Sequence, residues 1–172
     1  MILIKNGTII DPSCKREEKG DLLIADGKIA RIAPCGEIQE EGCEVIDATG
    51  MVVAPGLVDV HVHFRDPGFT YKENIDTGAQ AALQGGFTSV VLMANTKPVV
   101  DNEETLDYVL EKGKNTPIHV YSCASVSKGL QGKELVDMAL LYSKGAAGFT
   151  DDGIPLLDVD ILEQAFVKAA SI

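Results

Sequence analysis

Four apolar segments recur at nearly equal intervals in the second part of the chain. They begin near Leu57, Phe87, Ile118 and Ala147, so that successive starts are 30, 31 and 29 residues apart. This interval is the length of one strand followed by one helix and their connections. Two of the segments are apolar throughout, which is typical of parallel strands covered on both faces. Residues 55–172 are therefore predicted to form an α/β fold of four βα units.

Two α/β architectures contain such a succession. The first half of a (β/α)8 TIM-type barrel is the prediction, and an open four-stranded sheet is the alternative. A complete barrel needs about 250 residues, whereas this chain has 172. A half-barrel leaves its outer strands as unpaired edges and one apolar face uncovered. We therefore expect the chain to be a fragment or a half-gene product that needs further polypeptide.

Local signals predict where the intervening helices begin and end. Thr70 and Glu73 form a potential capping box, and Gly85-Gly86 is typical of a helix end. Asp101-Asn102 and Asp158 provide side chains that can cap two later helices.

Residues 1–54 are predicted to form a small β-sandwich-like domain, because they contain short strand patterns and no helix pattern. The dipeptides Asn6-Gly7, Asp26-Gly27 and Thr49-Gly50 each separate two of these strand patterns. Asn-Gly and Asp-Gly favour tight hairpins because these residues tolerate a positive φ. We therefore expect turns at these dipeptides, with Asp26-Gly27 as the strongest hairpin signal.

Composition narrows the classes of function. The net charge of −11 argues against binding to nucleic acid or to anionic membrane surfaces. No apolar stretch approaches the ~18 residues of a membrane span, and the first residues lack the basic region of a signal peptide. The four cysteines show no C-x-x-C pair, so they are expected to be free thiols. These features predict a cytoplasmic protein that acts on a small molecule.

The segment His61-Val62-His63 follows the first strand of the α/β region. Residues at positions i and i+2 of a strand point to the same side, so both imidazoles can reach one point. Two neutral imidazoles suit Zn²⁺ or a similar borderline ion. Arg65 continues the alternation, where its cation could hold an anionic ligand beside the metal. Asp59 lies on the same strand face and is a possible partner of a ligand.

Polar residues also follow the other predicted strands. Asn95 follows the second strand, and Asp151 and Asp152 follow the fourth. Functional groups in parallel barrels lie at the carboxyl ends of the strands, so these side chains are expected at one mouth. Such a set suits metal-assisted attack of water on a small carboxylated amide. Taken alone, Asn95 and the aspartates are typical turn residues, and strand alternation does not choose between Asp151 and Asp152.

His119 lies at the opposite end of its strand and is expected to be structural.

With these residues in place, the chain resembles a dihydroorotase, one of the cyclic amidohydrolases of the amidohydrolase superfamily. The resemblance runs through all 172 residues. The matching segments are Leu3-Ile4-Lys5-Asn6-Gly7, Val45-Ile46-Asp47-Ala48, Pro55-Gly56-Leu57-Val58-Asp59-Val60-His61-Val62-His63, Arg65-Asp66-Pro67-Gly68, Met93-Ala94-Asn95-Thr96-Lys97-Pro98 and Phe149-Thr150-Asp151-Asp152-Gly153. The His-x-His pair followed by Arg-Asp-Pro-Gly is the most specific of them.

The resemblance implies a zinc-dependent hydrolase with one or two Zn²⁺ ions. It implies reversible interconversion of N-carbamoyl-L-aspartate and L-dihydroorotate in pyrimidine biosynthesis. By similarity, His61 and His63 bind metal, and Asp152 is a further metal ligand. Arg65 and Asn95 hold the substrate carboxylate by the same similarity.

The chain departs from this family in length. Family members carry two further histidine ligands and an aspartate that acts as general acid/base on later strands. The only histidines here are His61, His63 and His119, so the general acid/base is expected beyond Ile172. We therefore expect the chain by itself to be inactive or nearly so.

Two alternatives remain open. A non-catalytic dihydroorotase-like scaffold subunit would have no need of the two histidines and the arginine. The other alternative is a different cyclic amidohydrolase, a hydantoinase or an allantoinase, which usually has a carboxylated lysine after the fourth strand. Here Lys144 precedes that strand, which favours a dihydroorotase. A homo-oligomer and an association with aspartate transcarbamoylase are the possible protein partnerships.

Overall fold

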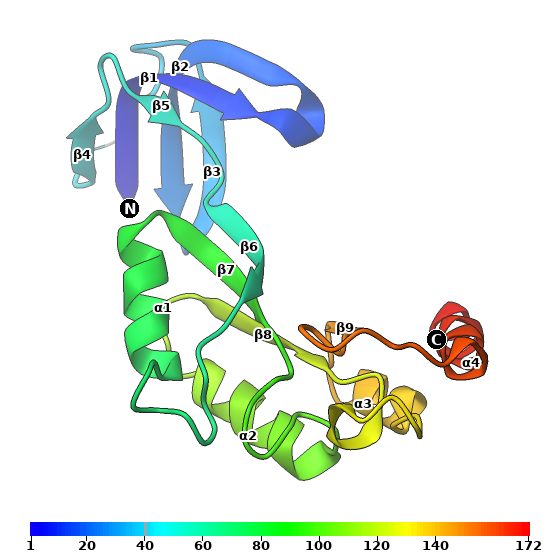
Figure 1. Cartoon of the computed structure of the whole chain (residues 1–172). Helices are drawn as coiled ribbons and strands as arrows, with labels where there is room; N and C mark the ends of the chain where they lie inside the picture. Colours follow the sequence, from blue (N-terminus) through cyan, green and yellow to red (C-terminus); the bar gives the residue numbers. More distant parts are fainter. Residues whose placement is uncertain (40) are drawn as a thin grey trace. The chain divides into compact units, whose positions relative to one another are not determined.

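The computed structural model describes residues 1–39 and 41–172, which form two compact units. The first unit comprises Met1–Pro55 and the second Gly56–Ile172. Each unit has its own sheet (Figure 1). Within the described residues, every helix is too short or too polar to cross a membrane.

The first unit is a five-stranded mixed sheet. Its order is β3-β2-β1-β4, and β5 also pairs with β1. β1 to β3 are antiparallel neighbours, whereas β4 and β5 run parallel to β1. The strands are β1 (Ile2–Asp11), β2 (Arg16–Ala25), β3 (Lys28–Ala33), β4 (Glu44–Asp47) and β5 (Val52–Val53), with the short 3-10 helix η1 (Pro12–Cys14) after β1.

Two of the three predicted turns are present, and the one with the strongest hairpin signal closes a hairpin. Asp26 and Gly27 connect β2 to β3 with φ angles of 51° and 70°. Two consecutive positive φ angles are the requirement of a type I′ turn, whose twist matches that of the flanking strands.

Thr49-Gly50 forms the predicted turn, in which Met51 N donates to Ala48 O at 2.9 Å, whereas the turn predicted at Asn6-Gly7 is wrong. Asn6 and Gly7 lie within the continuous strand β1, where the register with β2 shifts between Ile4 and Gly7. The positive φ of Asn6 thus serves a β-bulge, which needs the same backbone freedom as a turn. β4 and β5 pair with β1 and not with each other, because the long strand β1 offers its free edge to both.

The second unit has a parallel sheet with the order β6-β7-β8-β9. The strands occur in chain order and alternate with helices, so the predicted fold class of a parallel half-barrel preceded by a β unit is confirmed. The elements are β6 (Leu57–Val62), α1 (Ile75–Gln84), β7 (Phe87–Leu92), α2 (Glu103–Gly113), β8 (His119–Ala124), η2 (Lys128–Leu130), α3 (Met138–Ser143), β9 (Gly148–Phe149) and α4 (Val159–Ala170).

Two of the predicted helix starts are correct and one is displaced. Asn102 and Asp158 cap α2 and α4 with their side-chain oxygens. The cap of α1 is Asn74 instead of Thr70, because Asn74 and Thr77 form a reciprocal capping box directly before Ile75. Gly86 has a positive φ of 83° and lies directly after the end of α1, as predicted for Gly85-Gly86.

Helices cover one face of the parallel sheet. α1 and α2 lie on the same side of the strands (Figure 1). The buried cluster on this side combines Ile75 and Ala79 of α1, Leu106 and Val109 of α2, Met138 and Leu141 of α3, and Val90, Leu92, Val120 and Ala124 of the strands. Outside this cluster, Tyr121 and the edge-strand residues Val58 and Val60 are exposed.

A buried aromatic ring fixes the chain directly after His63. The Phe64 side chain is buried against α1 at Gly78. A Cβ atom at Gly78 would lie 2.4 Å from Phe64 Cδ1, which is closer than atoms can approach. Gly78 therefore allows the segment after the His-x-His pair to pack closely on the helix.

We predict that Gly78→Ala destabilises the chain, although alanine is the better helix former by about 1 kcal/mol. The added methyl group collides with a buried ring, and such overpacking costs about 1–3 kcal/mol. Urea unfolding measures the change. Gly148→Ala is the matched control, since its Cβ would meet only Cys123 Sγ at an ordinary 3.6 Å. Equal effects of the two substitutions would contradict the packing argument.

Candidate metal centre

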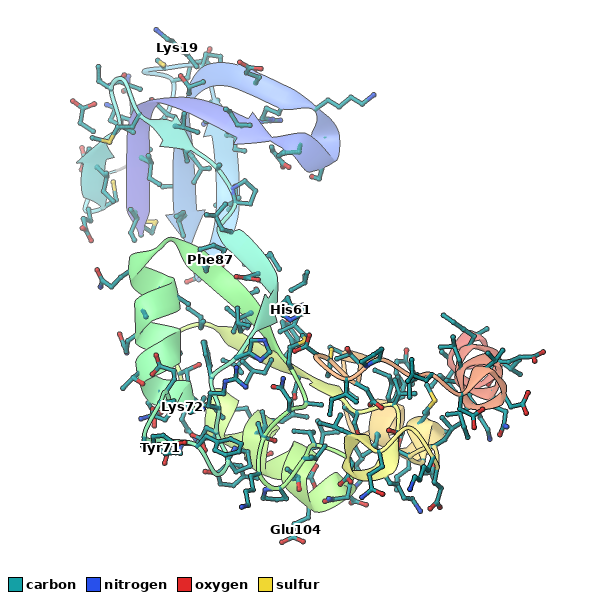
Figure 2. The ribbon with its side chains drawn as sticks, viewed as in Figure 1. Lys19, His61, Tyr71, Lys72, Phe87 and Glu104 are labelled. Atoms are coloured by element: carbon teal, nitrogen blue, oxygen red, sulfur yellow. The ribbon has the colours of Figure 1, made fainter. Side chains whose placement is uncertain are left out.

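Strand β6 brings two imidazoles to one end of the parallel sheet. His61 is on β6 and His63 follows it by two residues, so both rings project to the same side. Their centroids are 5.2 Å apart. Figure 2 shows His61 at the carboxyl end of β6, on the side away from α1.

A carboxylate from the far edge of the sheet meets both imidazoles. Asp152, which follows β9, has Oδ1 3.2 Å from His61 Nε2 and Oδ2 3.4 Å from His63 Nε2. One ligand atom from each of the three residues lies within 4.8 Å of the other two. The His61 side chain is 54% exposed, and those of His63 and Asp152 are 27% and 23% exposed. The cluster is thus accessible from solvent but partly shielded.

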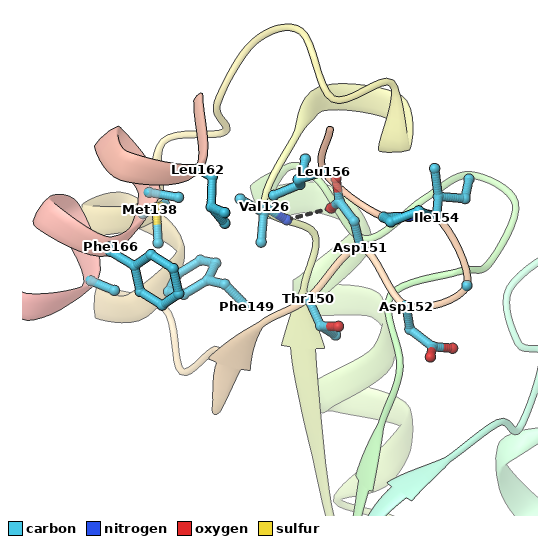
Figure 3. Close-up of a pocket in the computed structure, with 14 residues that line it drawn as sticks. Val126, Met138, Phe149, Thr150, Asp151, Asp152, Ile154, Leu156, Leu162 and Phe166 are labelled. Carbon is cyan, nitrogen blue, oxygen red and sulfur yellow. Dashed lines mark hydrogen bonds between the residues drawn. The ribbon is translucent and has the colours of Figure 1, made fainter. Parts of the chain in front are cut away.

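The two neighbouring aspartates have different surroundings. Asp151 is buried and accepts hydrogen bonds from Val126 N (2.7 Å), Ser127 N (3.1 Å) and the Ser127 hydroxyl. Figure 3 shows the Asp151 and Asp152 carboxylates pointing in opposite directions. Asp151 therefore holds the 126–127 loop, and Asp152 is the residue that faces the histidines. Sequence alternation left this choice open.

Asn95 lies between two members of the cluster. Its Oδ1 is 3.0 Å from His63 Nδ1, and its Nδ2 donates to Asp152 Oδ2 at 3.0 Å. Asn95 follows β7, so three strands of the sheet contribute to one network.

Arg65 is held between two buried neighbours. Phe64 and Asp66 are both buried in the second unit, and Arg65 has a φ of 59°, which non-glycine residues adopt rarely. Within residues 1–39 and 41–172, the Arg65 guanidinium has no hydrogen-bond or ion-pair partner. Its cation is therefore available to an anion.

Asp66 anchors this segment to two helices. Its side chain is 0% exposed and accepts hydrogen bonds from Lys112 Nζ (2.6 Å), Tyr108 Oη (2.9 Å) and Ile75 N (3.2 Å). Burial by itself would raise the Asp66 pKa, but the hydrogen bonds outweigh burial and hold this pKa below its ordinary value. The hydrogen bond to Asp66 in turn raises the pKa of Lys112. Sequence reasoning missed Lys112 and Tyr108, because nothing in α2 indicates a partner 42–46 residues away.

Two other residues considered from the sequence lie outside the cluster. Asp59 Oδ1 accepts a hydrogen bond from His61 N at 3.0 Å, so it holds the backbone and not the imidazole. His119 is exposed at the start of β8, with its ring 6.4 Å from that of Tyr121.

The donor set of the cluster suits a metal ion. Histidine nitrogen and carboxylate oxygen are ligands that Zn²⁺ binds. A neutral imidazole and a carboxylate both present lone pairs, so the space between them favours a proton or a metal ion. The observed Nε2–Oδ separations of 3.2 and 3.4 Å are therefore consistent with a cation at this point.

A large apolar pocket lies beside the cluster but does not contain the histidines. Its volume is about 630 Å³. It borders Asp151 and Asp152, and its walls include Met138, Phe149 and Phe166 (Figure 3). Because this lining is largely hydrocarbon, the polar cluster at the strand ends is the better candidate for chemistry.

Comparison with known sequences identifies similar proteins. The sequence model of the family described as dihydro-orotase-like matches residues 50–172. The chain is 57% identical over 169 residues to a dihydroorotase of Clostridioides difficile and 53% identical over 169 residues to one of Streptococcus pneumoniae. These alignments cover 98% of this chain and 40% of each relative. The chain thus spans about two fifths of the length of these curated relatives.

Solved structures share the fold. An L-hydantoinase from Arthrobacter aurescens matches 99% of this chain with a TM-score of 0.79 at 23% identity, and the match covers 38% of that chain. A D-hydantoinase matches 97% of this chain with a TM-score of 0.75 at 28% identity, and the match covers 37% of that chain. The likeness extends over nearly the whole of the present chain.

We predict effects of different size on the free energy of unfolding for the two aspartates. Asp151→Ala leaves two backbone N–H groups and a hydroxyl without their acceptor, at a cost of about 1–3 kcal/mol for each buried group. Asp152→Ala removes contacts to partly exposed imidazoles and should change the free energy of unfolding by about 1 kcal/mol or less. Urea unfolding without added metal distinguishes the two. A larger loss for Asp152→Ala would contradict the assigned roles.

We also predict that Asp66 makes stability depend on acidic pH. Because its folded-state pKa is lowered, its contribution is complete above its unfolded value of about 3.9. The contribution is lost as the pH falls through the lower folded-state pKa. Asp66→Asn should therefore weaken the fall in unfolding free energy below about pH 4. It should also cost about 3 kcal/mol at neutral pH, since Lys112 loses its buried counter-ion.

Chemical unfolding from about pH 7 to pH 2.5 tests this pH dependence. Asp76→Asn is the matched control, because the exposed Asp76 also faces Lys112, at 3.9 Å. That control should cost about 1 kcal/mol or less. An unchanged acid dependence in Asp66→Asn would refute the assignment.

Proposed function

Because this chain belongs to the dihydro-orotase-like family, we propose that it forms the metal-binding part of a cyclic amidohydrolase. The proposed reaction is the reversible interconversion of N-carbamoyl-L-aspartate and L-dihydroorotate in de novo pyrimidine biosynthesis. The observation that carries this proposal is the cluster of His61, His63 and Asp152, with the unpartnered cation of Arg65 on the segment directly after it. A metal and a carboxylate-binding group are the two features that such a substrate requires.

We propose Zn²⁺ as the cofactor, with one or two ions. His61 and His63 would bind it through imidazole nitrogens, and Asp152 offers two carboxylate oxygens, enough to bridge two ions. A bound ion would lower the pKa of water to about 7 and polarise the substrate carbonyl. The protein contributes a preset arrangement, because β6 fixes both imidazoles and the Asp151 hydrogen bonds fix the chain before Asp152.

The substrate carboxylate is assigned to Arg65 and Asn95. Arginine presents a planar fork of donors that matches a carboxylate, and an arginine stays charged at all relevant pH values. Asn95 Nδ2 uses one hydrogen for Asp152, so its second hydrogen remains for a ligand. Holding the charged end of the substrate in this way would orient the amide toward the metal.

The surroundings of Lys144 favour a dihydroorotase over a hydantoinase or an allantoinase. In those relatives a carboxylated lysine is expected at the position after the fourth strand. Lys144 caps the end of α3 and pairs with Glu103 on α2, whereas Asp152 occupies the position facing the histidines. The carboxylate of Asp152 is the proposed substitute, because it also offers two oxygens to a metal.

The 172 residues alone provide only part of the proposed chemistry. The chain contains three histidines, and His119 lies at the opposite end of its strand from the cluster. A second metal would thus lack imidazole ligands, and proton transfer would lack the general acid/base. We propose that the 172-residue polypeptide binds metal and has little or no turnover by itself. Its setting is the cytoplasm, and its proposed partner is a small-molecule substrate.

We predict that His61→Ala weakens zinc binding by at least about 10-fold, because one of three ligands is lost. Isothermal titration of the metal-free chain with zinc chloride measures the dissociation constant. His119→Ala is the matched control and should bind zinc as the unmodified chain does. A folded chain that takes up no zinc would overturn the metal assignment and would favour the scaffold alternative.

A chimeric enzyme tests the substrate. In the chimera, this chain would replace the matching 169 residues of the Clostridioides difficile dihydroorotase. The rest of the chimera would come from that relative. We predict that the chimera hydrolyses L-dihydroorotate and that Arg65→Met raises KM for it by about 10-fold or more, equal to 1.4 kcal/mol. A folded, zinc-loaded chimera that hydrolyses hydantoin in preference to dihydroorotate would contradict the proposal.

A further inference from the structure

Asn95 occupies a place in the cluster that substrate binding alone does not explain. Its amide oxygen is 3.0 Å from His63 Nδ1, and its amide nitrogen is 3.0 Å from Asp152 Oδ2. The side chain thus joins two of the three proposed metal ligands before any substrate is present. The orientation of its amide follows from the chemistry of these two neighbours.

An ionised carboxylate only accepts hydrogen bonds, so the group of Asn95 that faces Asp152 must be the NH2 group. The amide oxygen is then the atom that faces His63. Because a carbonyl oxygen only accepts, His63 Nδ1 must carry the hydrogen in this contact. Through Asn95, Asp152 therefore places a hydrogen-bond acceptor at His63 Nδ1, while its own Oδ2 lies 3.4 Å from His63 Nε2 and favours a cation there.

This tautomer is the one that a metal requires at this position. A neutral imidazole with a hydrogen on Nδ1 has its lone pair on Nε2. His63 Nε2 is the atom that lies 3.4 Å from Asp152 Oδ2 and faces the cluster. Imidazole binds a metal through its unprotonated nitrogen, and a hydrogen bond at the other nitrogen selects that tautomer.

His61 provides an internal comparison. Its ring contacts Asp152 and the His63 ring, and among residues 1–39 and 41–172 no side chain accepts a hydrogen bond from its Nδ1. His61 is also more exposed than His63. The arrangement that fixes a tautomer is therefore specific to His63.

We propose that Asn95 is a positioning residue that fixes His63 in the metal-binding tautomer and aligns Asp152 with it. This inference rests on the proposed metal-dependent function and adds a role for Asn95 besides contact with the substrate. Asn95 acts through its neighbours and is not itself a metal ligand in this scheme. The role is present in the chain before metal or substrate binds.

The first test reads the tautomer directly in the metal-free chain. Two-bond ¹H–¹⁵N correlation spectra of ¹⁵N-histidine-labelled protein show which ring nitrogen carries the hydrogen. Spectra are recorded at a pH at which the ring-nitrogen chemical shifts show a neutral imidazole for His63. We expect His63 to carry its hydrogen on Nδ1 in the unmodified chain. Asn95→Leu should convert it to a mixture or to the Nε2–H form, with His61 unchanged.

Asn95→Asp tests the contact with His63 without the NH2 group that donates to Asp152. One oxygen of its carboxyl group still accepts from His63 Nδ1, whereas the other replaces the NH2 donor and repels Asp152 unless a proton lies between them. We expect this variant to keep the Nδ1–H tautomer that Asn95→Leu loses. If Asn95→Leu does not fold, as judged by circular dichroism, the unmodified chain and Asn95→Asp still decide the question. An Nε2–H tautomer of His63 in either of these two proteins would overturn the proposal.

The second test measures zinc binding by titration with zinc chloride. Loss of a residue that orients a metal ligand typically costs 10- to 100-fold in affinity, so Asn95→Leu should raise the zinc dissociation constant about 10- to 100-fold. Asn115→Leu makes the same change at an exposed site, where the Asn115 side chain donates to Glu111 O, and should leave the constant unchanged. Unaltered zinc affinity in folded Asn95→Leu would refute the positioning role. If the unmodified chain binds no zinc, the proposed function fails. The spectra of the metal-free chain then still test whether Asn95 sets the tautomer of His63.

Discussion

The parallel pairing of β6, β7, β8 and β9 is the constraint on which the candidate metal centre depends. Parallel strands end at the same edge of a sheet, so residues that follow separate strands can meet there. β6 supplies the imidazoles, the segment after β7 supplies Asn95, and the segment after β9 supplies Asp152. A shift of one residue in the register of β6 would turn both imidazoles to the helix-covered face. The backbone hydrogen bonds of the sheet thus set the chemistry of its edge.

Much of this arrangement follows from sequence because it depends on local rules. The period of the strands, the i and i+2 spacing of His61 and His63, and the caps Asn102 and Asp158 each involve short stretches of chain. The turn expectation failed at Asn6-Gly7, since a turn and a bulge require the same positive φ. The pairing of β1 with β2 decided the outcome there, and pairing partners are not encoded locally.

The remaining features depend on contacts between distant segments. Asp151 and Asp152 have the same side chain and are adjacent, and their distant partners distinguish them: Asp151 is bonded by the amides of residues 126 and 127 and by the Ser127 hydroxyl, and Asp152 by Asn95. Asp66 is likewise committed to Lys112 and Tyr108 on α2. In both pairs of neighbours, one charged residue is buried and the other is only partly buried. Burial of Asp66 and Asp151 therefore leaves Arg65 and Asp152 within reach of solvent.

The contact between His61 and Asp152 joins the two outer strands of the sheet. Neighbouring strands are about 4.8 Å apart, so three flat intervals would separate β6 from β9 by roughly 14 Å. Side-chain atoms only 3.2 Å apart indicate that the sheet curves between these strands. A cation held by both residues would act as a removable cross-link across that arc. At a concentration 100 times its dissociation constant it would add about 2.7 kcal/mol to the free energy of unfolding.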